Sequence, residues 1–147
     1  MTSLTLVRRI RARPTVVFAA LTSAEGIAHW WGPDAGPVLL AESDARVGGL
    51  FRVRFRMLEG SEHESTGQYL ELIAPKLVVM SWQWTVGGDP DERGEVSRVV
   101  IELAPVDAGT ELTFTHERLQ TEAARSSHER GLAGALHKLE RYLSTGT

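Results

Sequence analysis

The sequence predicts an α+β fold in which a curved antiparallel sheet of about seven strands closes around one long C-terminal helix. Three observations support this prediction: an amphipathic segment at the C-terminal end, seven short segments with strand character, and short links between consecutive strands, which favour antiparallel pairs. Such a sheet can bury its apolar face only by curling around the single long helix.

The predicted long helix covers residues 122–143. One face gathers apolar and small residues at intervals of three and four, while the opposite face carries charged residues such as Arg130 and Lys138. At about 1.5 Å per residue the helix would be roughly 30 Å long, which is the width of a small domain. We therefore expect it to lie across the whole sheet. The inner face comprises Ala124, His128, Gly131, Leu132, Ala135, Leu136, Leu139, Tyr142 and Leu143.

The N-terminal part of the chain predicts one strand and then two short helices. Alternating residues indicate a strand over residues 3–12. Pro14 suits the first turn of a helix, because its fixed φ angle is close to the helical value, and an apolar side continues over residues 15–21. Ser23 is a candidate N-cap for a second helix, which ends at Trp30-Trp31.

Six further strands follow. The clearest covers residues 50–58, where apolar residues alternate with Arg52, Arg54 and Arg56. We expect these arginines to form a solvated face that pairs with nearby glutamates. A flexible acidic loop is predicted at residues 87–94. The six strands are predicted at 38–42, 50–58, 65–73, 77–86, 95–104 and 110–117, with a polar loop at 59–64.

Composition narrows the classes of function. The chain has 147 residues, of which 42% are hydrophobic, so we expect one domain over residues 1–147 with an ordinary core. It has no cysteine, which excludes disulfides and thiolate zinc sites and is typical of a cytoplasmic location. The net charge of −3 argues against nucleic-acid binding. No stretch resembles a signal peptide or a membrane span.

The sequence lacks the common catalytic and cofactor motifs. It has no Gly-x-Ser-x-Gly elbow, no His-Glu-x-x-His helix and no glycine-rich phosphate loop. The five histidines lack the paired spacing of a zinc site. We therefore expect no metal and no cofactor, we assign no catalytic residue, and we favour binding over catalysis. Any reaction would rest on acid–base chemistry by His116, His128 or Tyr69.

Aromatic residues mark the predicted inner face of the sheet. Trp82 and Trp84 share a strand face with Met80, and His116 follows Phe114 at a spacing of two. These residues either fill the core or line an apolar cavity that contains a few polar groups. A histidine in that position could orient a bound carbonyl or hydroxyl group, or it could simply bond to the backbone.

Small residues lie opposite, in the middle of the predicted long helix. Gly131 and Gly134 each cost roughly 1 kcal/mol relative to alanine there, so they need a reason. Either the helix lies very close to the sheet, or these residues leave space for a ligand. The predicted ligand-binding residues are Trp31, Phe55, Tyr69, Met80, Trp82, Trp84, Phe114, His116, His128, Gly131, Leu132 and Ala135.

The paired indoles Trp30 and Trp31 allow two interpretations. They could wall the mouth of a pocket or bind a partner, because each offers a large apolar area and a polar N–H group. Alternatively, they pack the short helices onto the sheet. An exposed Trp30 would indicate a dimer or a contact with another protein.

Several segments together resemble a known family. The most distinctive are Trp30-Trp31-Gly32-Pro33 and its distance from Gly48-Gly49. The others are residues 12–18, 67–72, 81–84, 109–116 and 128–132. In these segments the chain resembles the START-like (SRPBCC) superfamily, in the branch similar to the C-terminal domain of the activator of Hsp90 ATPase. It departs from that branch at Leu132, where a tryptophan is usual.

The resemblance implies a helix-grip fold with a cavity between the sheet and the terminal helix. It does not fix the function, because similar folds serve lipid carriers, cyclases, hormone receptors and co-chaperones. We expect binding of a small apolar or aromatic molecule in this cavity, which Leu132 would make larger than is usual for the family. One alternative is a co-chaperone in the stress response that stimulates the Hsp90 ATPase, with a chaperone or a second copy of the chain as its partner. Another is a cyclase- or hydrolase-like enzyme.

Overall fold

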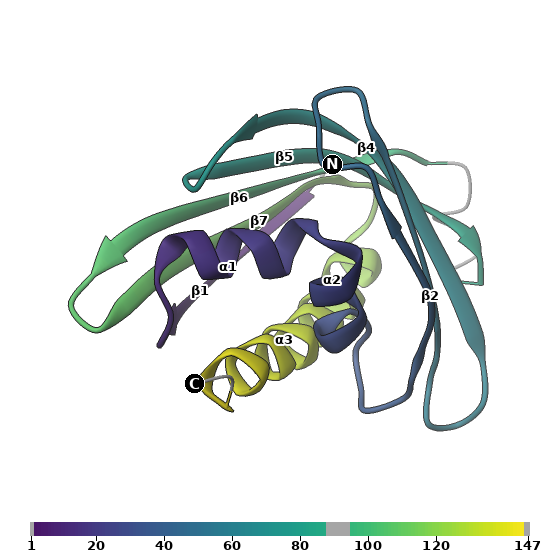
Figure 1. Ribbon diagram of the computed structural model, residues 1–147. Coiled ribbons are helices and arrows are strands. Elements are labelled where there is room, and N and C mark those ends of the chain that lie inside the picture. Colours follow the sequence, from purple (N-terminus) through teal and green to yellow (C-terminus); the bar gives the residue numbers. More distant parts are fainter. Residues whose placement is uncertain (1, 88–94, 146–147) are drawn as a thin grey trace.

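The computed structural model describes residues 2–87 and 95–145 (Figure 1). Within these residues the chain forms one antiparallel sheet of seven strands, two short helices and a long C-terminal helix. This arrangement confirms the predicted α+β helix-grip fold. The strands are β1 (Thr2–Ile10), β2 (Val38–Ser43), β3 (Leu50–Arg56), β4 (Glu62–Ile73), β5 (Leu77–Val86), β6 (Ser97–Val106) and β7 (Gly109–Leu119), and the helices are α1 (Pro14–Thr22), α2 (Ala24–Trp30) and α3 (Glu122–Thr145).

The strand order explains how the sheet encloses the helices. It is β1-β7-β6-β5-β4-β3-β2, so the first two strands of the chain form the two opposite edges. The chain travels from one edge to the other through α1 and α2. All three helices lie on the same, concave side of the sheet, which bends around α3 (Figure 1). Curvature of this kind gives α3 a partner surface on which to bury its apolar side.

Helix α3 begins with a cap and buries the predicted inner face. The side chain of Thr121 accepts a hydrogen bond of 3.0 Å from the backbone N–H of Ala124, which satisfies one of the open donors of the first turn. Leu136 and Leu139 are fully buried, and Ala124 and Ala135 are buried as well. The spacing of these residues is the one that the sequence predicts for the face toward the sheet.

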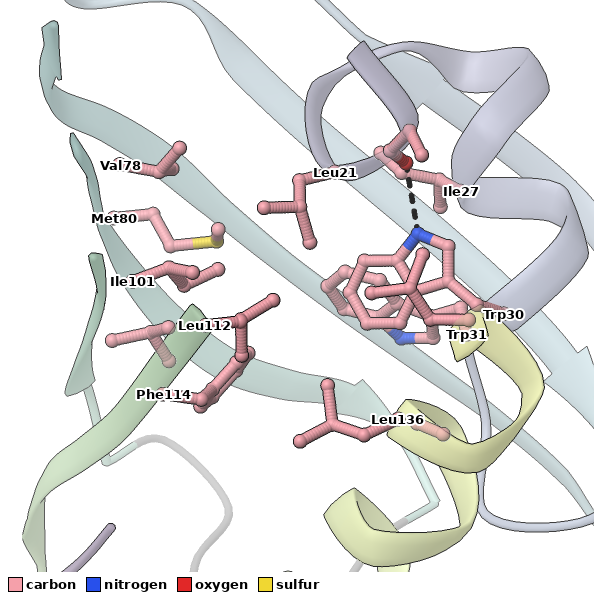
Figure 2. Packing of buried hydrophobic residues seen from close by; sticks show 14 of the residues in the cluster. Leu21, Ile27, Trp30, Trp31, Val78, Met80, Ile101, Leu112, Phe114 and Leu136 are labelled. Carbon is pink, nitrogen blue, oxygen red and sulfur yellow. Dashed lines mark hydrogen bonds between the residues drawn. The ribbon is translucent and has the colours of Figure 1, made fainter. Parts of the chain in front are cut away.

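Hydrogen bonds hold helices α1 and α2 together on the concave side of the sheet. Ser23 caps α2 as predicted, because its hydroxyl accepts a hydrogen bond from the backbone N–H of Gly26. The indole N–H of Trp30 donates to the carbonyl of Ala20 over 2.9 Å. Figure 2 shows this bond and Leu21 facing the apolar side chains of the sheet. Trp30 is only 3% exposed, so it does not offer the partner contact that an exposed indole would indicate.

The polar face of β3 and β4 shows where the sequence interpretation was right and where it was wrong. The predicted pairing of arginines with glutamates is confirmed by ion pairs such as Arg52–Glu42 at 3.2 Å and Arg56–Glu62 at 3.6 Å. The predicted loop at 59–64 is wrong for its last three residues, which begin β4. Its glutamates pair across the strands with arginines of β3, a tertiary contact that residue alternation does not reveal. Most of the predicted loop at 87–94 lies outside the described residues.

Candidate functional site

A cavity of about 710 Å³ lies between the concave face of the sheet, the segment after α2 and the N-terminal half of α3. Cavities of roughly 300–1,000 Å³ are typical of small-molecule sites. All of the predicted ligand-binding residues line it except Tyr69. Those that line it are Trp31, Phe55, Met80, Trp82, Trp84, Phe114, His116, His128, Gly131, Leu132 and Ala135.

Tyr69 lies in the core, outside the cavity. Its side chain is 1% exposed, and its hydroxyl is 2.7 Å from the hydroxyl of Ser43. Ser43 in turn donates to the carbonyl of Thr22, so this network joins β4, β2 and α1. Burial raises the pKa of Tyr69 above its usual value. The ring does not line the cavity and packs against neighbours such as Phe51, whose ring centroid is 5.8 Å away.

The deepest part of the cavity is apolar. Met80, Val99 and Phe114 are contributed by three adjacent strands, and each is less than 10% exposed. Met80 pairs with Val99, and Val99 pairs with His116, so one row across β5, β6 and β7 reaches the cavity. Phe114 lies two residues before His116 on β7 and points to the same face. A ligand group that reaches the floor must therefore be apolar, because burying an unpaired polar group is costly.

Two tryptophans and two histidines form a connected cluster on one wall. The rings of Trp82 and Trp84 meet edge to face, with their centroids 4.5 Å apart. His128 of α3 lies 5.0 Å from Trp82, and His116 lies 4.7 Å from His128, both in edge-to-face geometry. Aromatic pairs in this arrangement each contribute about 0.5–1.5 kcal/mol beyond burial. The cluster therefore holds its shape and offers aromatic surfaces to the cavity.

His116 is a neutral group inside this cluster. Its side chain is 5% exposed, and its Nε2 atom is 2.7 Å from the buried hydroxyl of Ser97. Burial, together with the neighbouring His128, lowers the pKa of His116 to about 3. At neutral pH the imidazole is therefore uncharged, and the contact with Ser97 leaves at most its other ring nitrogen for a ligand.

The two glycines of α3 have different roles. A Cβ atom at position 134 would clash with the backbone of Pro33, so Gly134 allows α3 to approach the segment after α2. A Cβ atom at position 131 would meet only Pro33 Cβ, at 3.5 Å, which is an ordinary contact. Close approach thus explains Gly134, although its close neighbour is the segment after α2 and not the sheet. Gly131 borders the cavity and has no side chain to occupy it.

The segment that follows α2 is held against α3 by Lys138. The Nζ atom of this half-buried lysine donates to the carbonyls of Trp31 and Asp34, over 2.8 and 2.7 Å. Burial lowers the pKa of Lys138, and the nearby Asp34 partly opposes this shift. Trp31 is fixed a second time, because its indole N–H donates to Ser65 over 3.2 Å. Trp31 thus packs α2 onto the sheet and walls the cavity at the same time.

The rim of the cavity is polar and partly exposed. Ser127 and Arg130 are exposed on α3, while Asp34, Met57 and His63 are half-exposed on the opposite side. We therefore place the mouth between the N-terminal half of α3 and the turns next to β2 and β4. The buried floor and the polar rim give the cavity a direction, with its apolar end inside.

Part of this lining was missed in the sequence interpretation. His63 falls within the predicted loop at 59–64, although it pairs with Phe55 in the sheet. Arg130 falls on the predicted solvated face of the long helix, and nothing in the helical period separates a rim residue from a solvated one. Trp30, which was considered as a possible wall of a pocket mouth but not included among the ligand-binding residues, also lines the cavity. The other lining residues that were not predicted are Gly32, Pro33, Asp34, Met57, Val99 and Ser127.

The described residues form neither a metal site nor a membrane-spanning helix. Across residues 2–87 and 95–145, no three histidine, aspartate or glutamate side chains come together in a way that could hold a metal ion. Likewise, none of the helices in the described part of the chain combines the length and apolar character needed to cross a membrane.

Comparison with known proteins relates this fold to a family. The family model described as activator of Hsp90 ATPase homolog 1-like protein matches residues 11–144. No curated protein matches closely enough to add to this comparison.

Solved structures agree with the family match. The AHSA1 protein of Silicibacter pomeroyi is 27% identical, with 99% of this chain and 100% of that chain covered and a TM-score of 0.86. A protein from Chromobacterium violaceum is 25% identical, with 96% of each chain covered and a TM-score of 0.85. A protein from Nitrosomonas europaea is 26% identical, with 97% and 94% covered and a TM-score of 0.79. The chain belongs to the activator of Hsp90 ATPase homolog 1-like family, within the START-like (SRPBCC) superfamily.

Proposed function

We propose that the protein binds a small apolar or aromatic molecule in the cavity between the sheet and α3. The observation that carries this proposal is a cavity of about 710 Å³ with an apolar floor and an aromatic wall. The START-like fold commonly binds hydrophobic ligands, which agrees with this role. Burial of apolar ligand surface would supply the affinity, at roughly 25 cal/mol per Å² before the costs of association.

The wall favours a ligand with a flat ring. Trp82 and Trp84 meet at an interplanar angle of 79°, so a planar molecule in this corner can stack on one indole while it meets the edge of the other. His128 lies nearly parallel to Trp84, at 29°, with the two ring centroids 6.1 Å apart. An aliphatic ligand would fill the space but would gain less from these faces.

Catalysis in the same cavity has weaker support. A general base works best when its pKa is near the working pH and when it can reach the substrate. The pKa of His116 is about 3, and one of its nitrogens contacts Ser97, so it is a weak base at neutral pH. Of the other two candidates, Tyr69 does not line the cavity, and His128 lines it as a member of the aromatic cluster. We therefore propose binding without an assigned reaction.

Filling the cavity from α3 tests the proposal directly. Gly131→Leu places a side chain in the cavity, and Gly131→Ala adds only one methyl group at an ordinary distance from Pro33. We expect the wild type and Gly131→Ala to show quenched tryptophan fluorescence with members of a panel of small aromatic molecules. Gly131→Leu should lose this response by at least about tenfold in affinity, while its thermal unfolding stays cooperative.

Two results would contradict binding in this cavity. If a folded Gly131→Leu protein binds the panel as tightly as Gly131→Ala does, the ligands do not occupy this cavity. A panel that leaves the fluorescence of the wild type unchanged throughout would also count against it, because four tryptophans line the cavity.

A further inference from the structure

The charges at the mouth of the cavity point to the kind of ligand it takes. Among the lining residues that the structure describes, only Asp34 and Arg130 carry a full charge at neutral pH through an acidic or strongly basic side chain. Both belong to the partly exposed rim. They differ in how their polar atoms are used by the protein itself.

Asp34 is occupied by the fold. One carboxylate oxygen accepts a hydrogen bond of 2.8 Å from the backbone N–H of Gly36, and the other accepts one of 3.1 Å from that of Leu58. These bonds tie the segment after α2 to the turn that follows β3. A carboxylate that already has a donor on each oxygen contributes to the shape of the rim, and it has little left to offer a cationic ligand.

Arg130 is not occupied in this way. Among the described residues, no carboxylate forms an ion pair with it, whereas Arg125 on the same helix pairs with Glu129 at 3.0 Å. Its guanidinium presents donors in a planar fork that matches a carboxylate. Ser127, three residues earlier, lies on the same side of the helix and adds a hydroxyl to this part of the rim.

The interior of the cavity excludes charge. The floor is made by Met80, Val99 and Phe114, and the buried His116 is held neutral by its surroundings. A charged ligand group placed there would lose its hydration without gaining a partner. A ligand with one charged group is therefore oriented by the cavity: its apolar part goes in, and its charge stays at the rim.

We propose that the ligand is an aromatic carboxylate, whose ring lies against Trp82 and Trp84 and whose carboxylate pairs with Arg130 at the mouth. This inference rests on the function proposed above and makes it more specific. Gly131, the next residue of α3, has no side chain that could block the approach of the carboxylate to the guanidinium. In this arrangement the aromatic wall supplies most of the affinity, and Arg130 selects ligands that carry a carboxylate.

A matched pair of probes tests this assignment. We would measure the dissociation constants of 2-naphthoate and of its neutral amide, 2-naphthamide, by tryptophan quenching at low salt. The wild type should bind the acid about fivefold tighter, as expected for a partly exposed charged pair, and 0.5 M NaCl should reduce this preference. Arg130→Gln should remove the preference while leaving the affinity for the amide within about twofold.

Two further variants serve as controls. Arg130→Lys keeps the charge but loses the planar fork, so it should retain part of the preference for the acid. Arg141→Gln removes an arginine from the same helix that does not line the cavity, and it should behave as the wild type does. Comparison of these variants separates a specific contact from the general positive field of the helix.

The outcomes separate this inference from the proposed function. If the wild type binds acid and amide equally well, the cavity binds aromatic molecules but the inferred carboxylate contact is wrong. A preference for the acid that survives in Arg130→Gln would also overturn the inference. If neither probe binds and the neutral aromatic panel fails as well, the proposed function fails together with it.

Discussion

The two halves of α3 meet the rest of the protein in opposite ways. Over most of the C-terminal half, Leu136 and Leu139 are fully buried and belong to the hydrophobic core. In the N-terminal half, His128 and Gly131 border a cavity of about 710 Å³. One continuous helix therefore stabilises the fold at one end and leaves room for a ligand at the other.

The largest expected difference comes from shortening one leucine in each half. Leu136→Ala should lower the free energy of unfolding by about 2–5 kcal/mol, because it leaves a void in a closed core. Leu132→Ala should cost less than half as much, since Leu132 is half-exposed and borders space that is already open. Urea unfolding of both variants measures the difference. Equal losses would mean that the two halves are equally well packed.

The cavity end should be more sensitive to acid. The pKa of His116 is about 3 in the folded protein and 6.5 in an unfolded chain, so only the unfolded state takes up this proton between those values. The contribution of His116 is complete above pH 6.5 and is lost as the pH falls toward 3. From pH 6.5 to 4.5 the loss is on the order of 2 kcal/mol.

Variants isolate this contribution from that of the other titrating groups. His116→Gln keeps an amide near Ser97 but cannot take up the proton, so its stability should fall less steeply over this range of pH. The exposed His137 on α3 provides the matched substitution, and His137→Gln should keep the steep wild-type profile. Unfolding curves at several pH values would contradict the assignment if all three proteins had the same slope.

A third difference separates the two glycines. Gly134→Ala should destabilise the protein by about 1–3 kcal/mol, because the new methyl group meets the backbone of Pro33 and forces α3 away. Gly131→Ala should be neutral or stabilise the protein by up to about 1 kcal/mol, because alanine is the better helix former and the position has room. Thermal unfolding of the two proteins checks the order, and a reversed order would refute the assignment of the two glycines.

Residue patterns predict the fold of this protein better than its site. The helical period placed the buried face of α3, the strand at 77–86 has the predicted bounds, and Ser23 caps α2 as expected. These features depend on residue periodicity and on hydrogen bonds between near neighbours in the chain, and both can be read from the sequence. The inner face of the sheet is likewise readable, and it accounts for the aromatic wall.

The remainder of the site depends on how distant segments meet. Tyr69 is on the inner face of its strand, but its position along the strand puts it among core residues. Gly131 and Gly134 differ only because Pro33 approaches one of them closely. Arg130 is an exposed helix residue, and only the opposing segment at Asp34 makes its position a rim. Residue periodicity describes one helix or strand at a time, so it cannot predict these contacts between distant segments.

The way Lys138 holds the segment after α2 has a consequence for how the protein can change. Both of its acceptors are backbone carbonyls, those of Trp31 and Asp34, which every amino acid possesses. These two hydrogen bonds therefore do not depend on the side chain at Pro33, which lies between Trp31 and Asp34. A substitution at position 33 can therefore change the cavity lining while both hydrogen bonds from Lys138 keep their acceptors.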